Sequence, residues 1–240
     1  MANGEALVLS GARIIDGTGA EPVRGRSVVV EGGLITAVVD DARAPRGAGI
    51  DLAGHTLLPG LVNCHVHLCF GAEADPVRPM REEPVGLTAI KALLRARQTA
   101  EAGVTTVRDL GGRDYVEIAA RRAIQEGLIA GPRIIAAGRP VCMTGGHGHW
   151  LAREADGPDD ARKAVREQLK AGADVIKIIA TGGVMTPGVE PGSPQLTLEE
   201  MRAAIEEARK AGRGTAAHAM GASGIRGAVA ARIRPIEQGI

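Results

Sequence analysis

From residue 56 onward, the chain alternates between short apolar runs typical of buried strands and longer amphipathic runs typical of helices. The expected strands are 56–63, 104–109, 133–137, 174–180, 214–219 and 233–238. The expected helices between them are 86–101, 115–126, 158–171, 197–211 and 222–231. Repeated strand–helix units of this kind favour an α/β fold with a parallel sheet, open or closed into a barrel.

The first 55 residues have a different pattern. Short β-like runs at 6–9, 13–15, 27–30 and 34–39 are separated by turn residues such as Gly32-Gly33. This pattern predicts a small antiparallel sheet, too thin to be stable alone. We therefore expect two parts, a small β portion over 1–55 and a β/α portion over 56–240.

A pair of histidines occurs in the first strand of the β/α portion. His65 and His67 follow a Pro-Gly turn in an apolar run, and side chains two apart on a strand point to the same face. Two imidazoles about 7 Å apart at a strand end are half of a divalent metal site. The alternative is a pair of structural histidines; the spacing inside a buried strand favours metal.

Lys177 and His218 are expected on two later strands. Lys177 interrupts an otherwise apolar strand, where an ammonium is costly unless it is paired, neutralised or modified. Desolvation leaves a neutral, nucleophilic amine. His218 ends the next strand and would be a third strand-end imidazole. Polar, glycine-rich segments follow several of these strands, and β/α barrels keep their active sites at that end.

Composition excludes several classes of function. With 29 Lys and Arg against 28 Asp and Glu, nothing indicates binding to nucleic acid or to an anionic membrane. There is no apolar run long enough to span a bilayer and no secretory signal pattern at the N-terminus. Three cysteines without C-x-x-C spacing fit a reduced cytoplasm.

Taken together, these segments resemble the metal-dependent amidohydrolase superfamily. The resemblance rests on His65-Val-His67 after Leu-Pro-Gly, on Lys177 and on His218. The glycine-rich segments 144–149 and 180–188, together with 195–200, are similar to the imidazolonepropionase-like branch, which includes prolidase-type dipeptidases.

The resemblance implies a (β/α)8 TIM-type barrel, with about six of eight strands present, beside a small β-sandwich. It implies that Lys177 reacts with CO2 to form a carbamate that bridges two divalent ions, with zinc the expected metal. By this mapping His65, His67 and Lys177 hold one ion, while Lys177 and His218 hold the second. The expected activity is hydrolysis of amide or peptide bonds in dipeptides or N-acyl amino acids by metal-activated water.

The segment 144–149 carries two more histidines. His147 and His149 lie in a glycine-rich loop after the third strand. They would contact substrate or stabilise the tetrahedral oxyanion, or they are solvated imidazoles of a loop. The residues alone leave both interpretations open. For Arg108, in the run 104–109, we favour a structural role.

The sequence departs from the family pattern near its end. The sixth strand of the family carries a histidine where this chain has Gln238, and an amide oxygen is a far poorer zinc ligand than imidazole. By strand alternation Glu237 is expected to face away from the barrel interior. With six strands before Ile240, we expect a C-terminally incomplete member of doubtful activity.

Two alternatives to an active hydrolase therefore stay open. One is a non-catalytic metal-binding remnant or a subunit that depends on a partner, either a homo-oligomer or a complementing chain. The other is a structural β/α protein without metal, in which the strand-end histidines and Lys177 would occur together only by chance.

Overall fold

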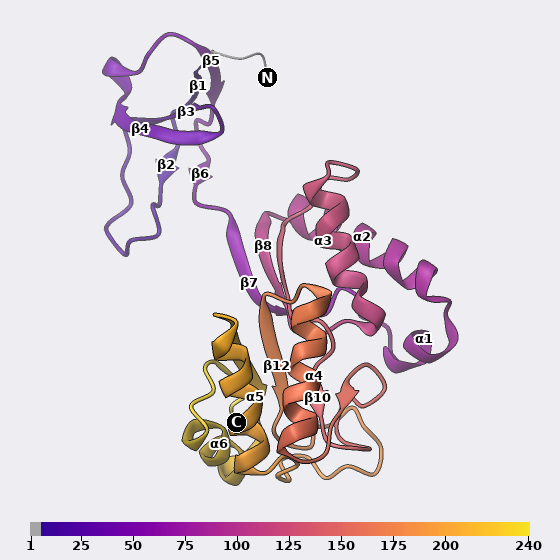
Figure 1. Ribbon diagram of the computed structural model, residues 1–240. Helices are drawn as coiled ribbons and strands as arrows, with labels where there is room; N and C mark the ends of the chain where they lie inside the picture. The colour runs from indigo at the N-terminus through magenta and orange to yellow at the C-terminus, as the bar shows by residue number, and fades with distance from the viewer. Residues whose placement is uncertain (1–5) are drawn as a thin grey trace. The chain divides into compact units, whose positions relative to one another are not determined.

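The computed structural model describes residues 6–240. Its contacts group the chain into two compact units, Met1–Gly60 and Leu61–Ile240 (Figure 1). The division expected after residue 55 stays a prediction.

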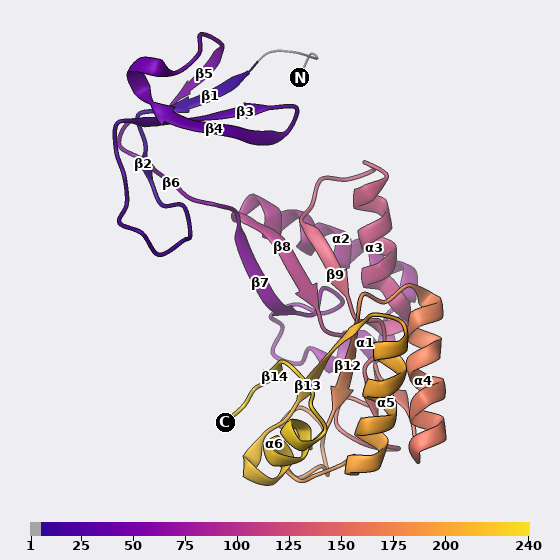
Figure 2. The same cartoon turned by 60° about the vertical axis from the view of Figure 1, so that its left-hand side comes forward.

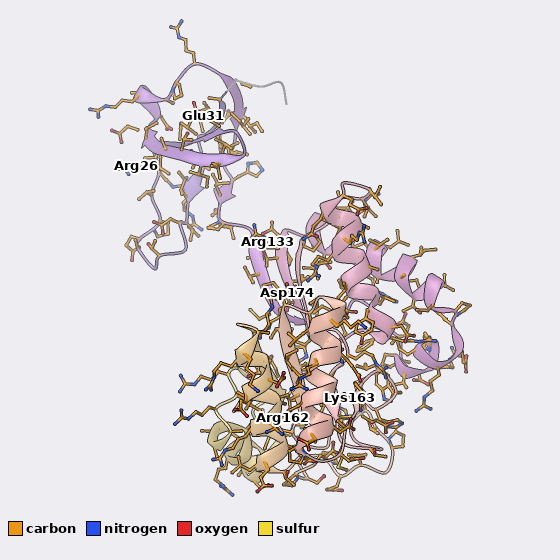
Figure 3. The ribbon with its side chains drawn as sticks, viewed as in Figure 1. Arg26, Glu31, Arg133, Arg162, Lys163 and Asp174 are labelled. Atoms are coloured by element: carbon orange, nitrogen blue, oxygen red, sulfur yellow. The ribbon has the colours of Figure 1, made fainter. Side chains whose placement is uncertain are left out.

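The first unit contains a four-stranded sheet in the order β4-β3-β1-β5. Its strands are β1 (Leu7–Ser10), β3 (Arg26–Glu31), β4 (Leu34–Asp40) and β5 (Ala48–Asp51). Arg26 and Glu31 mark the two ends of β3 (Figure 3). Gly32 and Gly33, both with positive φ, join β3 to β4 in a two-residue hairpin loop. The sheet is not purely antiparallel as expected, because β5, absent from the sequence prediction, pairs parallel with β1.

The strand predicted over 56–63 is wrong in its bounds. Pro59 and Gly60 interrupt the run, so β6 (Thr56–Leu57) ends before them and pairs with β2 (Arg13–Ile14). The first strand of the second unit, β7, is Leu61–Val66.

The second unit is built on parallel strands whose neighbours in space follow the order of the chain. These are β7, β8 (Val104–Asp109), β9 (Arg133–Ala136), β10 (Val141–Cys142), β12 (Val175–Ile179), β13 (Gly214–His218) and β14 (Ile236–Glu237), with β11 (Arg153–Glu154) beside β10. A backbone hydrogen bond from Asp174 to Ala136 joins the β7–β9 sheet to the β10–β14 sheet. The predicted α/β class with six successive parallel strands is confirmed; β10 and β11 were not predicted.

Helices cover one face of these strands (Figures 1 and 2). They are α1 (Val77–Glu82), α2 (Val85–Glu101), α3 (Val116–Gln125), α4 (Pro158–Ala171), α5 (Leu198–Lys210) and α6 (Gly221–Ala230), with a 3-10 turn at Arg113–Tyr115. The first unit has a 3-10 turn of its own at Asp41–Arg43. A capping box of Thr197 and Glu200 starts α5. Helix α1 was not predicted. No helix among residues 6–240 is both long enough and apolar enough to cross a membrane.

Small side chains let the helices lie close to the strands. Ile176 and Ile178 of β12 pack in one cluster with Ala164 of α4 and with Ala204 and Ala208 of α5. Because side chains alternate along a strand, Lys177 lies on the opposite face of β12, away from the helices. That face is where the histidines gather.

The sheet is strongly curved. A side chain of the first strand, His65 on β7, lies 2.9 Å from a side chain of the last, Glu237 on β14, although β8, β9, β10, β12 and β13 lie between these strands in the spatial order. Such curvature is the arrangement of a TIM-type barrel, and it brings both ends of the strand series to one site.

Candidate active site

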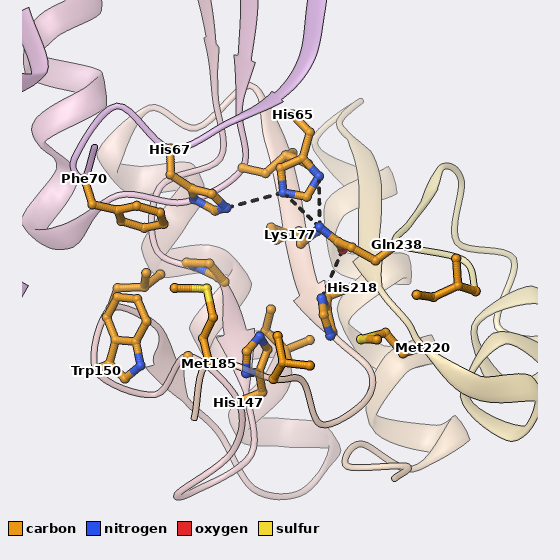
Figure 4. Close-up of a pocket in the computed structure, with 17 residues that line it drawn as sticks. His65, His67, Phe70, His147, Trp150, Lys177, Met185, His218, Met220 and Gln238 are labelled. Carbon is orange, nitrogen blue, oxygen red and sulfur yellow. Dashed lines mark hydrogen bonds between the residues drawn. The ribbon is translucent and has the colours of Figure 1, made fainter. Parts of the chain in front are cut away.

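The two histidines at the end of β7 face each other. His65 lies on the strand and His67 directly after it, and their Nε2 atoms are 3.3 Å apart (Figure 4). Nδ1 of His67 lies 2.8 Å from the Gly111 carbonyl oxygen. Because a carbonyl only accepts, Nδ1 carries the proton and Nε2 of His67 presents a lone pair. The ring is further held by stacking on Phe70, with centroids 4.9 Å apart.

A carboxylate holds the other side of His65. Oε2 of Glu237 lies 2.9 Å from Nδ1 of His65, and Oε1 accepts a hydrogen bond of 2.6 Å from Arg108. Arg108 also donates from Nε to the carbonyl oxygen of Cys64, at 2.8 Å. Glu237 therefore does not face away as expected. It is the last residue of β14, and Gln238, with φ of 53°, already departs from strand geometry, so alternation fails there.

Lys177 lies in the middle of β12 and is 2 % exposed. Its Nζ has no hydrogen-bond partner within residues 6–240. Burial lowers the pKa of Lys177 from 10.5 to about 7, with Glu237 opposing that shift. A large fraction of this amine is therefore neutral at physiological pH, with a free lone pair.

His218, the last residue of β13, has both ring nitrogens engaged. Nδ1 lies 3.0 Å from Oε1 of Gln238, and Nε2 lies 3.3 Å from the Gly182 carbonyl oxygen. Nε2 of Gln238 in turn lies 3.4 Å from each ring nitrogen of His65. Gln238 thus links the histidines of β7 and β13.

The loop histidines occupy different places. His147 lies next to His218, with ring centroids 4.6 Å apart, and its Nδ1 is 3.0 Å from Oγ1 of Thr186. His149 turns back to the Gly146 carbonyl oxygen in its own loop, at 3.1 Å. His147 lines the cavity described next, whereas His149 is absent from its lining.

These side chains surround a cavity of about 290 Å³. Its titratable lining comprises His65, His67, His147, Lys177 and His218. The rest of the wall is mostly apolar and includes Phe70, Leu110, Trp150, Leu151, Ile179, Val184, Met185 and Met220 (Figure 4). Burial lowers the pKa of both His67 and His147 to about 4 and also lowers those of His65 and His218. At neutral pH the cavity therefore presents neutral imidazoles, which are the form that binds metals.

The donor set fits one divalent ion better than two. Two imidazole nitrogens bound to one tetrahedral ion lie roughly 3.3 Å apart, which matches the spacing of His65 and His67. The unpartnered amine of Lys177 lines the same cavity. His218 fits less well, because each of its nitrogens already has a protein partner. No group of three or more His, Cys, Asp and Glu side chains suited to a metal occurs in the described part of the chain, so a third ligand from this chain would be Lys177.

Sequence reasoning missed several residues of this site. Phe70 and Trp150 belong to no recognised motif. They are two of only three aromatic residues in the sequence, so an aromatic cavity wall had few candidates. Arg108 was expected to be structural and Glu237 to face away from the barrel interior, so neither was predicted at the site. An arginine inside the β-like run 104–109 was the available signal.

The chain is similar to known hydrolases. Residues 56–240 match the model of the amidohydrolase family. Ochratoxinase from Aspergillus niger is 31% identical over 97% of this chain and 54% of its own length. Imidazolonepropionase from Klebsiella pneumoniae is 51% identical over a shorter stretch, 19% of this chain and 11% of that protein.

The same likeness extends to solved structures. A prolidase crystallised with N-methylphosphonate-L-proline superposes with a TM-score of 0.89 at 33% identity, over 98% of this chain and 61% of that one. The chain thus spans about half the length of the ochratoxinase and under two thirds of the prolidase chain.

Proposed function

This chain belongs to the amidohydrolase family, and on that premise we propose that its histidine-lined cavity hydrolyses amide bonds of small molecules. The proposed substrates are dipeptides or N-acyl amino acids. Relatives named prolidase, Xaa-Pro dipeptidase and N-acyl-D-aspartate deacylase support this class. The apolar wall beside the imidazoles suits an acyl group or side chain without charge.

The observation that carries the proposal is the buried amine of Lys177, which has no hydrogen-bond partner among residues 6–240 and lines the same cavity as His65 and His67. A neutral amine adds to CO2, forming a C–N bond and releasing one proton, and so becomes a carbamate with two oxygen ligands. We propose that this carbamate, His65 and His67 hold a divalent ion, with zinc the expected metal, and that His218 contributes to a second ion. Such ions would lower the pKa of a water molecule and polarise the scissile carbonyl.

The remaining side chains would bind and orient the substrate. His147 is neutral at pH 7 and lines the cavity, so it is placed to hydrogen-bond to a substrate carbonyl or amide. His149 lies on the same loop but outside the cavity lining, and we propose that it contacts the part of the substrate that extends beyond the cavity. Phe70 and Trp150, with ring centroids 6.1 Å apart, would exclude water from one side.

A second candidate is a metal-binding subunit that does not hydrolyse by itself. The engagement of both ring nitrogens of His218 favours it, because a second ion would lose this ligand. Such a subunit would gain activity in a homo-oligomer or with a complementing chain.

We also propose the cytoplasm as the compartment of this protein, since Cys64, Cys69 and Cys142 are all free thiols.

The test begins with metal content. The purified chain, His67→Ala and a control, His55→Ala, are incubated with Zn²⁺ or Mn²⁺ and bicarbonate, desalted and measured by emission spectrometry. His55 lies in the first unit and is exposed. Wild type and His55→Ala should retain metal and His67→Ala should lose it. The loaded proteins are then assayed against a panel of dipeptides and N-acyl amino acids. Equal metal in all three proteins would contradict the site.

Hydrolysis separates the two candidates. Release of free amino acid by metal-loaded wild type, absent in His67→Ala, supports the hydrolase. Stable metal binding without release of product from any member of the panel supports the non-hydrolytic subunit.

A further inference from the structure

Arg108, Glu237 and His65 form a chain of contacts across three strands. Arg108 on β8 donates a hydrogen bond of 2.6 Å to Oε1 of Glu237 on β14. The other carboxylate oxygen of Glu237, Oε2, lies 2.9 Å from Nδ1 of His65 on β7. The Arg108 and Glu237 side chains are 19% and 11% exposed, and that of His65 is 24% exposed. Water therefore screens these contacts only in part.

The carboxylate determines where the proton of His65 lies. An ionised carboxylate only accepts hydrogen bonds, so the short contact with Glu237 requires the proton on Nδ1. With the proton on Nε2 instead, the Nδ1 lone pair would face a negative oxygen at 2.9 Å. The ion pair with Arg108 fixes the direction of the Glu237 carboxylate.

The orientation of His67 agrees with this assignment. Nε2 of His67 presents a lone pair toward His65, because its Nδ1 proton is donated to Gly111. The side-chain amide of Gln238 lies 3.4 Å from both ring nitrogens of His65 and so does not distinguish the two tautomers. Nε2 of His65 thus has a lone pair of its own and lies beside a second one, an arrangement that a cation would stabilise.

We propose that Glu237, held by Arg108, is a positioning residue that fixes His65 as its Nδ1–H tautomer and so presents the Nε2 lone pair to a divalent cation. This inference rests on the proposed metal site. Carboxylates that orient metal-bound imidazoles raise the basicity of the ligand and typically change metal affinity by about 10–100-fold. Arg108 acts through Glu237, and its bond to the Cys64 carbonyl ties it to the residue before His65.

The first measurement needs no metal. The metal-free protein is labelled with ¹⁵N-histidine, and the two ring nitrogens of His65 are assigned with the help of His65→Gln. Wild type should show the Nδ1–H tautomer. Glu237→Ala should shift His65 toward Nε2–H, and Glu237→Gln, whose amide oxygen still accepts, should keep most of the Nδ1–H form. A His65 that is Nε2–H in wild type would overturn the proposal.

The second measurement is metal affinity, with Zn²⁺ itself as the probe in competition with a chelating dye. Glu237→Ala should bind Zn²⁺ about 10–100-fold more weakly than wild type, with Glu237→Gln between the two. The control is Glu199→Ala, an exposed carboxylate on α5, which should bind as wild type does. Adding Arg108→Met to Glu237→Ala should weaken Zn²⁺ binding little further, because Arg108 acts through the carboxylate that is already lost.

The two readouts separate this inference from the proposed function. Wild type that binds no Zn²⁺ but shows an Nδ1–H tautomer that Glu237→Ala loses would refute the metal site and support the positioning role. Zn²⁺ affinity equal in wild type, Glu237→Ala and Glu237→Gln would refute the positioning role, even if His67→Ala abolishes binding. Thermal unfolding of each variant establishes that the comparison is made between folded proteins.

Discussion

The side-chain oxygen of Gln238 lies 3.0 Å from Nδ1 of His218. The other ring nitrogen, Nε2, donates to the Gly182 carbonyl oxygen, so the lone pair of neutral His218 is on Nδ1, where the side-chain amide of Gln238 covers it. An amide is also a weak metal ligand compared with imidazole. Residue 238 therefore limits how well a second ion is bound.

Replacing Gln238 by histidine should raise the amount of Zn²⁺ bound per chain from about one toward two. The new imidazole supplies a ligand and releases His218. The backbone should accept it, because φ at 238 is 53° and histidine is among the residues that tolerate this region. Equilibrium dialysis measures the stoichiometry. Gln238→Leu releases His218 without adding a ligand, so an equal gain in that variant would contradict the ligand argument.

The carbamate of Lys177 is open to a direct test. Bicarbonate should raise Zn²⁺ occupancy of wild type, and ¹³C-labelled bicarbonate should give a carbamate signal in the NMR spectrum. Lys177→Ala should lose both the signal and most of the metal, and propionate should restore part of the metal because it supplies a carboxylate. Lys170→Ala, on the exposed side of α4, serves as control. Full Zn²⁺ occupancy with an unmodified Lys177 would show that the amine is not the bridging group.

His147 and His149 allow a matched comparison within one loop. Because only His147 lines the cavity, His147→Ala should weaken binding of N-acetyl-L-phenylalanine by about 5–10-fold, the worth of one hydrogen bond. His149→Ala should change it little. Quenching of Trp150 fluorescence measures binding without turnover, since Trp150 is the chain's one tryptophan and lies in the wall. A larger effect from His149→Ala would reverse the assignment of the two residues.

Much of the fold could be predicted because local signals agreed with tertiary structure. Helix α4 occupies its predicted range of 158–171, with a proline at its first turn and Gly172 in the left-handed conformation at its end. Strand β8 also has its predicted bounds, 104–109. In α4 the buried residues recur with the period of a helix, whereas β8 is marked by its β-branched residues, Val104 to Val107.

The parts that were missed depend on long-range geometry. The contact of His65 with Glu237 joins residues 172 apart in sequence, and it arises from the curvature of the sheet. Alternation placed Glu237 on the wrong side because β14 ends at that residue and Gln238 has a positive φ. Likewise, nothing local shows that the β-like run at 56–63 is divided between two units at Gly60.

A buried carboxyl pair lies behind the site. Glu117 on α3 is fully buried, and both of its carboxyl oxygens lack hydrogen-bond partners in the described chain. Its carboxyl abuts Gly112, where a Cβ atom would lie 1.7 Å from Oε2. Burial raises the pKa of Glu117 from 4.5 to about 7, and burial together with the Glu117 charge raises the pKa of Asp109.

This pair gives stability a defined dependence on pH. Between about pH 4.5 and 7, folded Glu117 holds a proton that the unfolded chain has released. The folded state therefore binds more protons, and the contribution of Glu117 to the free energy of unfolding is complete below pH 4.5 and is lost as pH rises through 7. Glu117→Gln, neutral at every pH, should lack this loss. Its stability relative to wild type should rise from pH 5 to pH 8 by up to about 3 kcal/mol.

Urea unfolding followed by circular dichroism at pH 5, 6, 7 and 8 measures that difference. Comparison with wild type at each pH cancels the opposing contribution of the buried histidines, whose lowered pKa values make the fold gain stability as pH rises through 4 to 6.5. Glu126→Gln, an exposed acid just after α3, is the matched control and should give a nearly constant offset. If the curves of wild type and Glu117→Gln run parallel across this range, the buried carboxyl does not take up a proton on folding.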